Sequence, residues 1–361
     1  MNVKNIAFRT DATRQIGSGH FMRCLTLANQ LKNQGCQTRF ISRNLPEVYQ
    51  SMLQARGHEF FAIDMYDTDS TLDEVAHAHW LGCSQASDAD ATRRVLSDRT
   101  WDWLIVDHYA LDIRWECLLR SQVKKIMVID DIADRQHDCD VLLDQNFYAD
   151  METRYLGKVP THCQLLLGPH YALLRDEFRR LHEEVKPRTG PLKRILIFFG
   201  GVDADNYTSR AIETLFAIGL TGLHVDVVIG AQHPNYVQIK TACSRYRYTC
   251  HVQTDKMAEL MADADLAIGA GGSVAWERCC LALPTIVFVV ARNQEHASRA
   301  LANRGAVYLG RNEMFVAEIE RAMRHFLVPA NLHEMSVNAA DLVDGQGTKR
   351  LCDILLGWTW Q

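Results

Sequence analysis

The chain has 361 residues, of which 47% are hydrophobic and 23% charged, and its formal net charge at pH 7 is −5. Because single hydrophobic cores stop growing near about 250 residues, we expect two domains rather than one. The composition is that of a folded globular protein. The Lys and Arg residues are scattered along an acidic chain, which excludes the basic patch of a nucleic-acid-binding protein.

The start of the chain and its cysteines indicate the compartment. The opening sequence MNVKNIAFRT has no apolar signal core, and the apolar run Pro284–Ala291 is too short to cross a bilayer. None of the eleven cysteines forms a CxxC pair, so the sequence indicates neither a disulfide framework nor a thiolate zinc site. We therefore expect a cytoplasmic monomer with reduced thiols, and neither a membrane nor a nucleic acid as partner.

The first half of the chain alternates strand-like and helical patterns. It opens with a strand at Asn5–Thr10, a long polar loop and a helical stretch from Phe21 to Gln34. Repeated units of this kind predict a parallel sheet covered by helices. Asp107 and Asp130 follow apolar runs, which places them at the carboxyl ends of strands, where open α/β sheets bind ligands. The further strand-like runs are Thr38–Ser42, Glu59–Ile63, Trp103–Asp107 and Lys125–Asp130.

The second half repeats this architecture after a charged segment that contains Pro187, Gly190 and Pro191, which is typical of an interdomain linker. Its first strand, Arg194–Phe199, ends at Gly200-Gly201. The predicted organisation is one Rossmann-like domain over 1–186, a linker over 187–193, a second Rossmann-like domain over 194–340 and a helical tail over 341–361. We expect that tail to pack on the first domain.

The stretch LAIGAGGSVAWE, Leu266–Glu277, carries the most chemical information. A strand runs into a turn with Gly271 and Gly272 and then directly into a helix, so bare backbone can approach a phosphate. The amides of this turn and the Ser273 hydroxyl are candidate pyrophosphate ligands, and Glu277, one helical turn later, suits the hydroxyls of a ribose. A tight packing turn is the alternative interpretation of the same glycines.

The first polar loop ends in Gly17-Ser18-Gly19-His20 at the predicted start of a helix. It lacks the last glycine of the GxGxxG dinucleotide motif. The positive end of a helix dipole disfavours a protonated imidazole, and a neutral imidazole is what a general base requires. His20 is therefore the candidate base, with simple capping or packing of the helix as the alternative.

Other polar residues are weaker candidates. Asp107 and Tyr109 follow a strand and are expected at the edge of the site, where they bind sugar hydroxyls or assist the base. Asp130 and Asp131, with His137 and Asp138, lack a second cluster that would complete a metal site, so we expect no metal and no cofactor. His77 and His79, which lie near Trp80, are expected to have no catalytic role.

Several distinctive motifs occur together between Phe8 and Ala297, namely FRTDATRQIGSGHFMRC, IVDHYALD, VIDDIADRQHDCDVLLDQN, GPHYALLRDEF, FFGGVDADN, IGAGGSVAWE and ARNQEHA. With them the chain resembles the UDP-2,4-diacetamido-2,4,6-trideoxy-β-L-altropyranose hydrolases of the pseudaminic acid pathway. The match covers most of the chain and is looser beyond Gly310.

The resemblance implies a glycosyltransferase B type fold, similar to the MurG glycosyltransferase, with a cleft between the two domains and UDP held by the second. It also implies metal-independent hydrolysis of a UDP-sugar with inversion at the anomeric carbon, with His20 as the base that acts on water. Arg175, Glu277 and Asn293 match the family's substrate contacts. The full set of expected substrate-binding residues is Gly17, Gly19, Asp107, Tyr109, Arg175, Gly200, Gly271, Gly272, Ser273, Glu277 and Asn293.

Two other functions remain open at this stage. The same fold and phosphate turn serve a UDP-sugar glycosyltransferase equally well, because fold alone does not determine the acceptor. A nucleotide-sugar binding protein without catalytic activity is the second alternative. The position of His20 argues against it.

Overall fold

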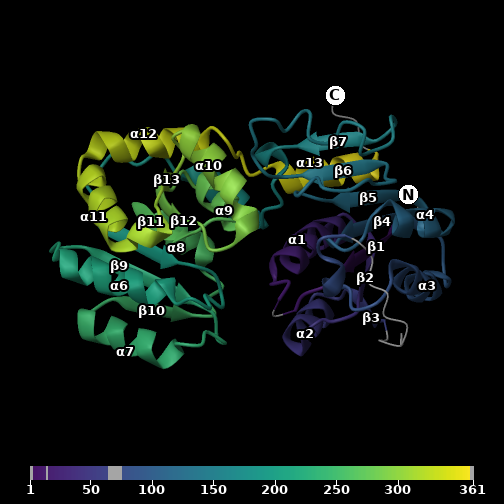
Figure 1. Cartoon of the computed structure of the whole chain (residues 1–361), viewed down its shortest axis with the longest axis horizontal. Coiled ribbons are helices and arrows are strands. Elements are labelled where there is room, and N and C mark those ends of the chain that lie inside the picture. Colours follow the sequence, from purple (N-terminus) through teal and green to yellow (C-terminus); the bar gives the residue numbers. More distant parts are fainter. Residues whose placement is uncertain (1–2, 14, 64–74, 358–361) are drawn as a thin grey trace. The chain divides into compact units, whose positions relative to one another are not determined.

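The computed structural model describes residues 3–13, 15–63 and 75–357. Contacts divide the chain into two compact units, each built around one parallel sheet (Figure 1). The first unit comprises residues 1–146, 150–173 and 347–361, and the second comprises 147–149 and 174–346. The expectation of two Rossmann-like α/β domains is therefore confirmed.

The first unit contains a seven-stranded sheet in the order β3-β2-β1-β4-β5-β6-β7, and every neighbouring pair is parallel. The strand order reverses between β1 and β4, which makes their carboxyl ends the topological switch point where such sheets bind ligands. The strands are β1 (Asn5–Thr10), β2 (Gln37–Ser42), β3 (Glu59–Ala62), β4 (Trp101–Asp107), β5 (Val123–Ile129), β6 (Val141–Asp144) and β7 (Gln164–Leu167).

Helices cover both faces of this sheet because alternate strand residues point to opposite sides. Ile6 and Phe8 of β1 belong to one buried cluster, whereas Ala7 belongs to the other. The first cluster also includes Leu351 and Leu355 from the far end of the chain. The helical elements are α1 (Gly19–Asn33), α2 (Glu47–Ala55), η1 (Ala78–Trp80), α3 (Gln85–Leu96), α4 (Ile113–Leu119), η2 (Arg120–Gln122), η3 (Pro169–Tyr171) and α13 (Gly347–Leu356).

The second unit contains a six-stranded parallel sheet in the order β10-β9-β8-β11-β12-β13. Its order reverses between β8 and β11, so the loops after these two strands form the corresponding switch point. The strands are β8 (Arg194–Phe198), β9 (His224–Ile229), β10 (Thr249–Val252), β11 (Leu266–Ala270), β12 (Thr285–Phe288) and β13 (Tyr308–Leu309). The helical elements are α5 (Asp176–Glu184), α6 (Tyr207–Ile218), α7 (Tyr236–Tyr246), α8 (Met257–Asp263), α9 (Val274–Cys280), η4 (Arg292–Gln294), α10 (Glu295–Asn303), η5 (Asn312–Met314), α11 (Phe315–Phe326) and α12 (Pro329–Ala340).

Local sequence explains where several helices begin and end. The Ser84 hydroxyl accepts a hydrogen bond from the Ser87 amide and so caps the start of α3. Asp112 caps α4 in the same way through the Arg114 amide. Gly219 closes α6 with a φ of 72°, a backbone conformation that favours glycine.

The boundary between the units lies at 173/174, whereas the sequence placed it at 186/187. The reason is that α5 packs against α8 and α9, with the Phe178 side chain fully buried and His182 hydrogen-bonded to the Cys280 carbonyl. Residues 187–193, predicted as a linker, also lie in the second unit, where the Arg188 side chain is buried.

The predicted tail contains α13, which lies in the first unit and packs against α1; the last residues, 358–361, lie outside the described part. The sequence did not predict the short strands β6, β7, β10 and β13, which have two to four residues each. Runs of this length are too short to show a clear alternation of apolar and polar residues.

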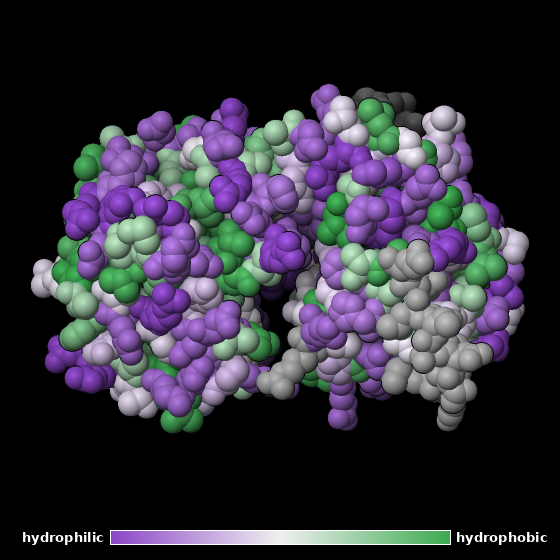
Figure 2. Space-filling model, in the orientation of Figure 1, coloured by the Kyte–Doolittle hydropathy of each residue, from purple (hydrophilic) through white to green (hydrophobic). Residues whose placement is uncertain are grey.

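The surface shows no sign of an extended apolar region on the face that Figure 2 displays, where hydrophobic and hydrophilic residues are interspersed. The exposed large hydrophobic side chains are distributed over many separate elements, such as Val48 in α2, Leu118 in α4 and Val237 in α7. Among the residues with described structure, no helix is both long enough and apolar enough to span a bilayer.

Candidate functional site

The candidate base lies at the switch point of the first unit. α1 begins at Gly19, so His20 is in its first turn, as the sequence predicted, and the loop before it follows β1. Gly17 has a φ of 78°, which favours glycine, and apart from adjoining backbone no atom of the described residues lies within 4 Å of the position that a Cβ would take at Gly17 or Gly19. The backbone of this loop is therefore accessible to a ligand.

A buried carboxylate holds the His20 ring. Nδ1 of His20 lies 2.6 Å from Oδ1 of Asp107, the last residue of β4, which is the neighbour of β1 in the sheet. Arg23, one turn after His20 on α1, donates from Nε and Nη2 to the two Asp107 oxygens at 2.6 and 2.7 Å. Asp107 is fully buried, so its contacts fix the orientation of His20 and leave its carboxylate no access to solvent.

The charge state of Asp107 determines which nitrogen of His20 carries a proton. Burial raises the pKa of Asp107, but Arg23 and His20 more than offset this effect and hold that pKa below its usual range. An ionised carboxylate can only accept, so Nδ1 of His20 carries the proton in this hydrogen bond. Nη2 of Arg23 is also 3.3 Å from Nδ1, but the carboxylate contact is shorter. Nε2 is left as the acceptor, a point that the sequence did not specify.

Tyr109 and Asp131 complete this cluster. The sequence placed Tyr109 at the edge of the site and considered Asp131 only as a metal ligand. Tyr109 donates its hydroxyl to Asp131, and Arg23 also bonds Asp131 at 3.0 Å. Tyr109 is 4% exposed, and burial raises the pKa of its phenol. Tyr109 and Asp131 therefore form the neutral and anionic parts of one polar network that Arg23 connects to Asp107.

An aromatic group lies beside the base. The Trp80 ring is stacked on Tyr109 with their centroids 5.5 Å apart, and the Tyr109 ring contacts the His20 ring edge-on at 4.5 Å. His77, expected to have no catalytic role, contacts both Trp80 and Tyr109 at 4.6 and 5.3 Å. Trp80 and His77 come from the segment between β3 and α3, so no spacing rule along the chain could have placed them here.

The other acidic residues considered for metal binding have different partners. Asp130 accepts from the Ala133 amide and from Tyr155, and pairs with Arg135. His137 contacts Glu116, and Asp138 contacts Arg120. Within the described ranges, no three His, Cys, Asp or Glu residues are grouped so that they could hold a metal ion.

In the second unit, close packing requires glycine at two positions near the β11–α9 turn, and backbone conformation favours it at a third. A Cβ on Gly269 would lie 2.1 Å from the Phe198 carbonyl oxygen of the adjacent strand β8. Gly271 has the Ser298 hydroxyl 2.6 Å from the same position, and Gly272 has a φ of 88°. Gly200, which follows β8, has a φ of 102°. The two glycine loops therefore lie at the ends of neighbouring strands.

Glu277 and Arg175 lie close together in this unit although 102 positions separate them. Nη2 of Arg175 is 3.8 Å from Oε1 of Glu277, while its Nη1 is 2.6 Å from Glu177. Burial raises the pKa of Glu277 to about 6, because the nearby Arg175 charge only partly offsets the loss of solvent. The ion pair of Glu277 with Arg175 is thus long, and Arg175 is closer to Glu177 than to Glu277.

Residues of the RNQEHA motif reach the glycine turn, and the contact is made by Gln294 rather than by Asn293. The Gln294 amide lies 3.4–3.5 Å from the positions that a Cβ would take at Gly271 and Gly272, and its Oε1 accepts from the Val290 amide. Asn293 and Ser273 are exposed. The structure thus gathers the predicted residues Gly200, Gly271, Gly272 and Ser273, with Gln294 as an addition.

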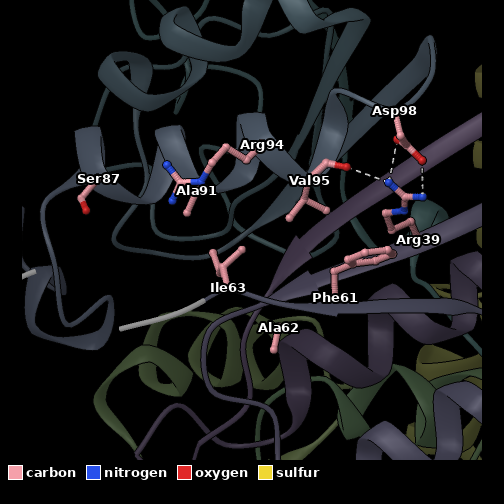
Figure 3. A pocket seen from close by; sticks show the side chains of 9 residues that line it. All are labelled: Arg39, Phe61, Ala62, Ile63, Ser87, Ala91, Arg94, Val95 and Asp98. Carbon is pink, nitrogen blue, oxygen red and sulfur yellow. Dashed lines mark hydrogen bonds and ion pairs between the residues drawn. The ribbon is translucent and has the colours of Figure 1, made fainter. Parts of the chain in front are cut away.

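A separate cavity of about 440 Å³ lies between β3 and α3 of the first unit, away from the residues described above (Figure 3). Arg39 forms part of its wall, but its guanidinium already bonds Asp98 and Glu59. The charge of Arg39 is therefore neutralised within the cavity wall.

Comparison with solved structures shows the fold of the chain. MurG from Acinetobacter baumannii superposes with a TM-score of 0.65 at 15% identity, covering 98% of this chain and 99% of that one. UGT2 from Phytolacca americana, solved with UDP-2-fluoro-glucose and pterostilbene, gives 0.68 at 12% identity, covering 99% of this chain and all of that one. The chain has the glycosyltransferase B fold, as the resemblance implied.

Sequence comparison shows which known proteins the chain resembles. Residues 194–350 match the glycosyltransferase family 28 C-terminal domain. The UDP-2,4-diacetamido-2,4,6-trideoxy-β-L-altropyranose hydrolase of Campylobacter jejuni is 25% identical over 302 residues, which cover 83% of this chain and 97% of that protein. The spore coat polysaccharide biosynthesis protein SpsG of Bacillus subtilis is 26% identical over 216 residues, 58% of this chain and 62% of that protein. The resemblance to the altropyranose hydrolases is thereby confirmed.

The geometry of the first unit predicts the tautomer of His20. Long-range ¹H–¹⁵N correlation spectra of the protein labelled at histidine should show the His20 ring protonated at Nδ1 near neutral pH, because the Asp107 carboxylate accepts only at that nitrogen. Asp107→Asn should remove this preference, since an amide can donate as well as accept. A wild-type ring protonated at Nε2 alone would contradict the arrangement.

Proposed function

We propose that this protein hydrolyses a UDP-activated diacetamido-trideoxy sugar of pseudaminic acid biosynthesis to UDP and free sugar, without a metal, and with inversion at the anomeric carbon. The observation that carries the proposal is the His20 ring, whose Nδ1 is held by a buried carboxylate and whose Nε2 has no partner among the described residues. The C. jejuni relative, named for this hydrolysis, supports the choice of substrate.

In the proposed reaction, Nε2 of His20 takes a proton from a water molecule as the water oxygen bonds to the anomeric carbon. The imidazolium that forms is stabilised by Asp107, which is itself kept anionic by Arg23. The bond between the anomeric carbon and the phosphate oxygen breaks, and its electron pair leaves with UDP. Asp107 is thus assigned to orienting the base rather than to binding a sugar hydroxyl.

The remaining residues of the first unit fit the binding of the sugar. Trp80 is partly exposed and stacked on Tyr109, which gives an apolar wall next to His20. Such a wall suits the apolar face and methyl group of a deoxy sugar. Asp131, whose side chain is 12% exposed, supplies a carboxylate beside this wall for a hydroxyl or acetamido N–H group of the sugar.

The second unit is proposed to hold UDP. Gly271 and Gly272 form the turn between β11 and α9, where Gly272 has a φ of 88°, and Ser273 adds an exposed hydroxyl for the diphosphate. Glu277 accepts from the ribose hydroxyls, a role that suits a half-buried carboxylate whose ion pair with Arg175 is long, at 3.8 Å. Arg175 and Asn293 are proposed to position the sugar and the diphosphate for attack.

Transfer of the sugar to an acceptor is the second candidate, because residues 194–350 match a glycosyltransferase domain. Both reactions need the same UDP site and differ in what attacks the anomeric carbon. Incubation with a UDP-diacetamido sugar and no acceptor separates them: a hydrolase turns over many equivalents, whereas a transferase releases UDP only slowly.

Replacement of the base should separate chemistry from binding. We expect His20→Ala to lower kcat by about 10²–10⁴-fold, the usual effect of losing a general base, with little change in UDP affinity, because UDP is assigned to the other unit. Steady-state kinetics and calorimetry measure the two quantities. Unchanged turnover in the variant would remove His20 from the mechanism.

Replacement of Glu277 should weaken nucleotide binding in a pH-dependent way. Glu277→Gln should cost about 1–3 kcal/mol of UDP affinity, as expected for a hydrogen bond to a charged group. Because burial raises the pKa of Glu277 to about 6, the carboxylate is ionised above that pH and protonated below it. The ratio of wild-type to variant affinity should therefore be largest near about pH 8 and smallest near about pH 5, and taking the ratio cancels the titration of UDP itself. A ratio of one at every pH would mean that Glu277 does not contact the ribose.

The position of bond cleavage can be read from an isotope label. In water enriched in ¹⁸O, the label should appear in the released sugar, because water attacks the anomeric carbon and the diphosphate leaves intact. Mass spectrometry of both products measures this, and NMR of the first sugar released reports its anomeric configuration. Label in the nucleotide, or UMP as the main product, would instead indicate a pyrophosphatase.

A further inference from the structure

A second charged residue, directly after Glu277, lies beneath the glycine turn. Arg278 belongs to α9, and its side chain is 2% exposed. Its Nη2 donates to the carbonyl of Ala270, and its Nη1 lies 2.8 Å from the position of a Cβ on Gly269. The guanidinium is therefore packed against the inner side of the turn at which the diphosphate is proposed to bind.

This guanidinium has no matched anion. Among the residues that the structure describes, Arg278 forms no ion pair, and its Nε is buried without a hydrogen-bond partner. Burial lowers its pKa to about 10, so the side chain remains cationic near neutral pH. A buried charge without a counter-ion is costly, because neither water nor an opposite charge replaces the lost hydration.

The turn itself needs a source of positive charge. α9 spans only seven residues, Val274–Cys280, so the dipole of this helix is small, and Ser273 makes no capping contact that would direct its hydroxyl. Glu277, the other charged residue at this place, is anionic when ionised and opposes a phosphate. Among the described residues, Arg278 is thus the cation whose contacts bring it against the turn, at Ala270 and Gly269.

We propose that Arg278 is a positioning residue that acts from behind the turn, where its positive charge and its bond to Ala270 stabilise the diphosphate as UDP departs. The proposal rests on the proposed function, since it assumes that the turn binds UDP. The charge acts through the backbone without touching the ligand, and its effect is strongest where water is excluded. The anion that neutralises Arg278 is then the ligand itself.

A purely structural role is the competing explanation, and the same unit supplies a matched control. Arg188 is also buried, and among the described residues it likewise donates only to backbone carbonyls, for example those of Ala264 and Leu281. Burial likewise lowers the pKa of Arg188 to about 10. Ala264 precedes β11, whereas Ala270 ends it, so the two arginines brace opposite ends of the same strand.

The test compares ligands that differ only in the number of phosphates. Arg278→Met, Arg278→Lys and Arg278→Gln, with the same three changes at Arg188, are titrated calorimetrically with UDP, UMP and uridine. For Arg278→Met we expect UDP affinity to fall about 30-fold, equivalent to about 2 kcal/mol, UMP affinity to fall less, and uridine affinity to be unchanged. The kcat should fall as well, because the charge on the diphosphate grows as UDP departs.

The order of the other variants separates charge from bracing. Lysine keeps the charge, whereas glutamine keeps only a hydrogen-bond donor. We therefore expect Arg278→Lys to retain more UDP affinity than Arg278→Gln. This comparison distinguishes charge from bracing even if the methionine variant does not fold. The Arg188 variants should lower the melting temperature without any dependence on phosphate number. Equal losses for UDP and uridine, or glutamine superior to lysine, would overturn the role of Arg278. Failure of the wild type to bind UDP would instead overturn the proposed function.

Discussion

The contact between β1 and β4 is the constraint on which the first unit's chemistry depends. Because these two strands are neighbours although about a quarter of the chain lies between them, the helix after β1 and the last residue of β4 meet at one point. Asp107 can then hold His20 and Arg23 together in a buried position. Loss of this pairing would leave three ionisable groups buried without partners, so structure and reactivity rest on the same carboxylate.

The two units treat buried charge differently. In the first, buried arginines have acidic partners close by: Arg9 lies between Asp11 and Asp88, and Arg23 between Asp107 and Asp131. In the second, Arg188 and Arg278 are buried against carbonyl groups alone. The balanced network of the first unit orients a base, whereas Arg278, whose Nε has no hydrogen-bond partner among the described residues, lies at the turn proposed to bind an anion.

The sequence predicted the parts of each site that depend on local chain pattern. His20, Gly271 and Glu277 could be recognised because a strand, a glycine turn and a helix follow one another directly, and the structure has these elements in that order. Arg23 could also have been found, since it lies one helical turn from His20 on the same face. Trp80 and Asp131 could not, because their contacts depend on how distant segments pack. Arg278 was missed for another reason: a charged residue next to Glu277 is expected at the surface, and its burial is visible only in three dimensions.

The return of α13 to the first unit has a consequence for how the protein is made. Leu351, Cys352 and Leu355 lie in the same core as Phe8 and Phe40, and the Leu355 carbonyl accepts from Trp103 Nε1 at 2.8 Å. A chain that emerges from the ribosome amino end first therefore synthesises nearly the whole second unit before it can complete the first one. Until then the apolar surface that α13 covers stays open to solvent. Chaperones that bind such surfaces therefore have longer access to the first unit, although it is translated first.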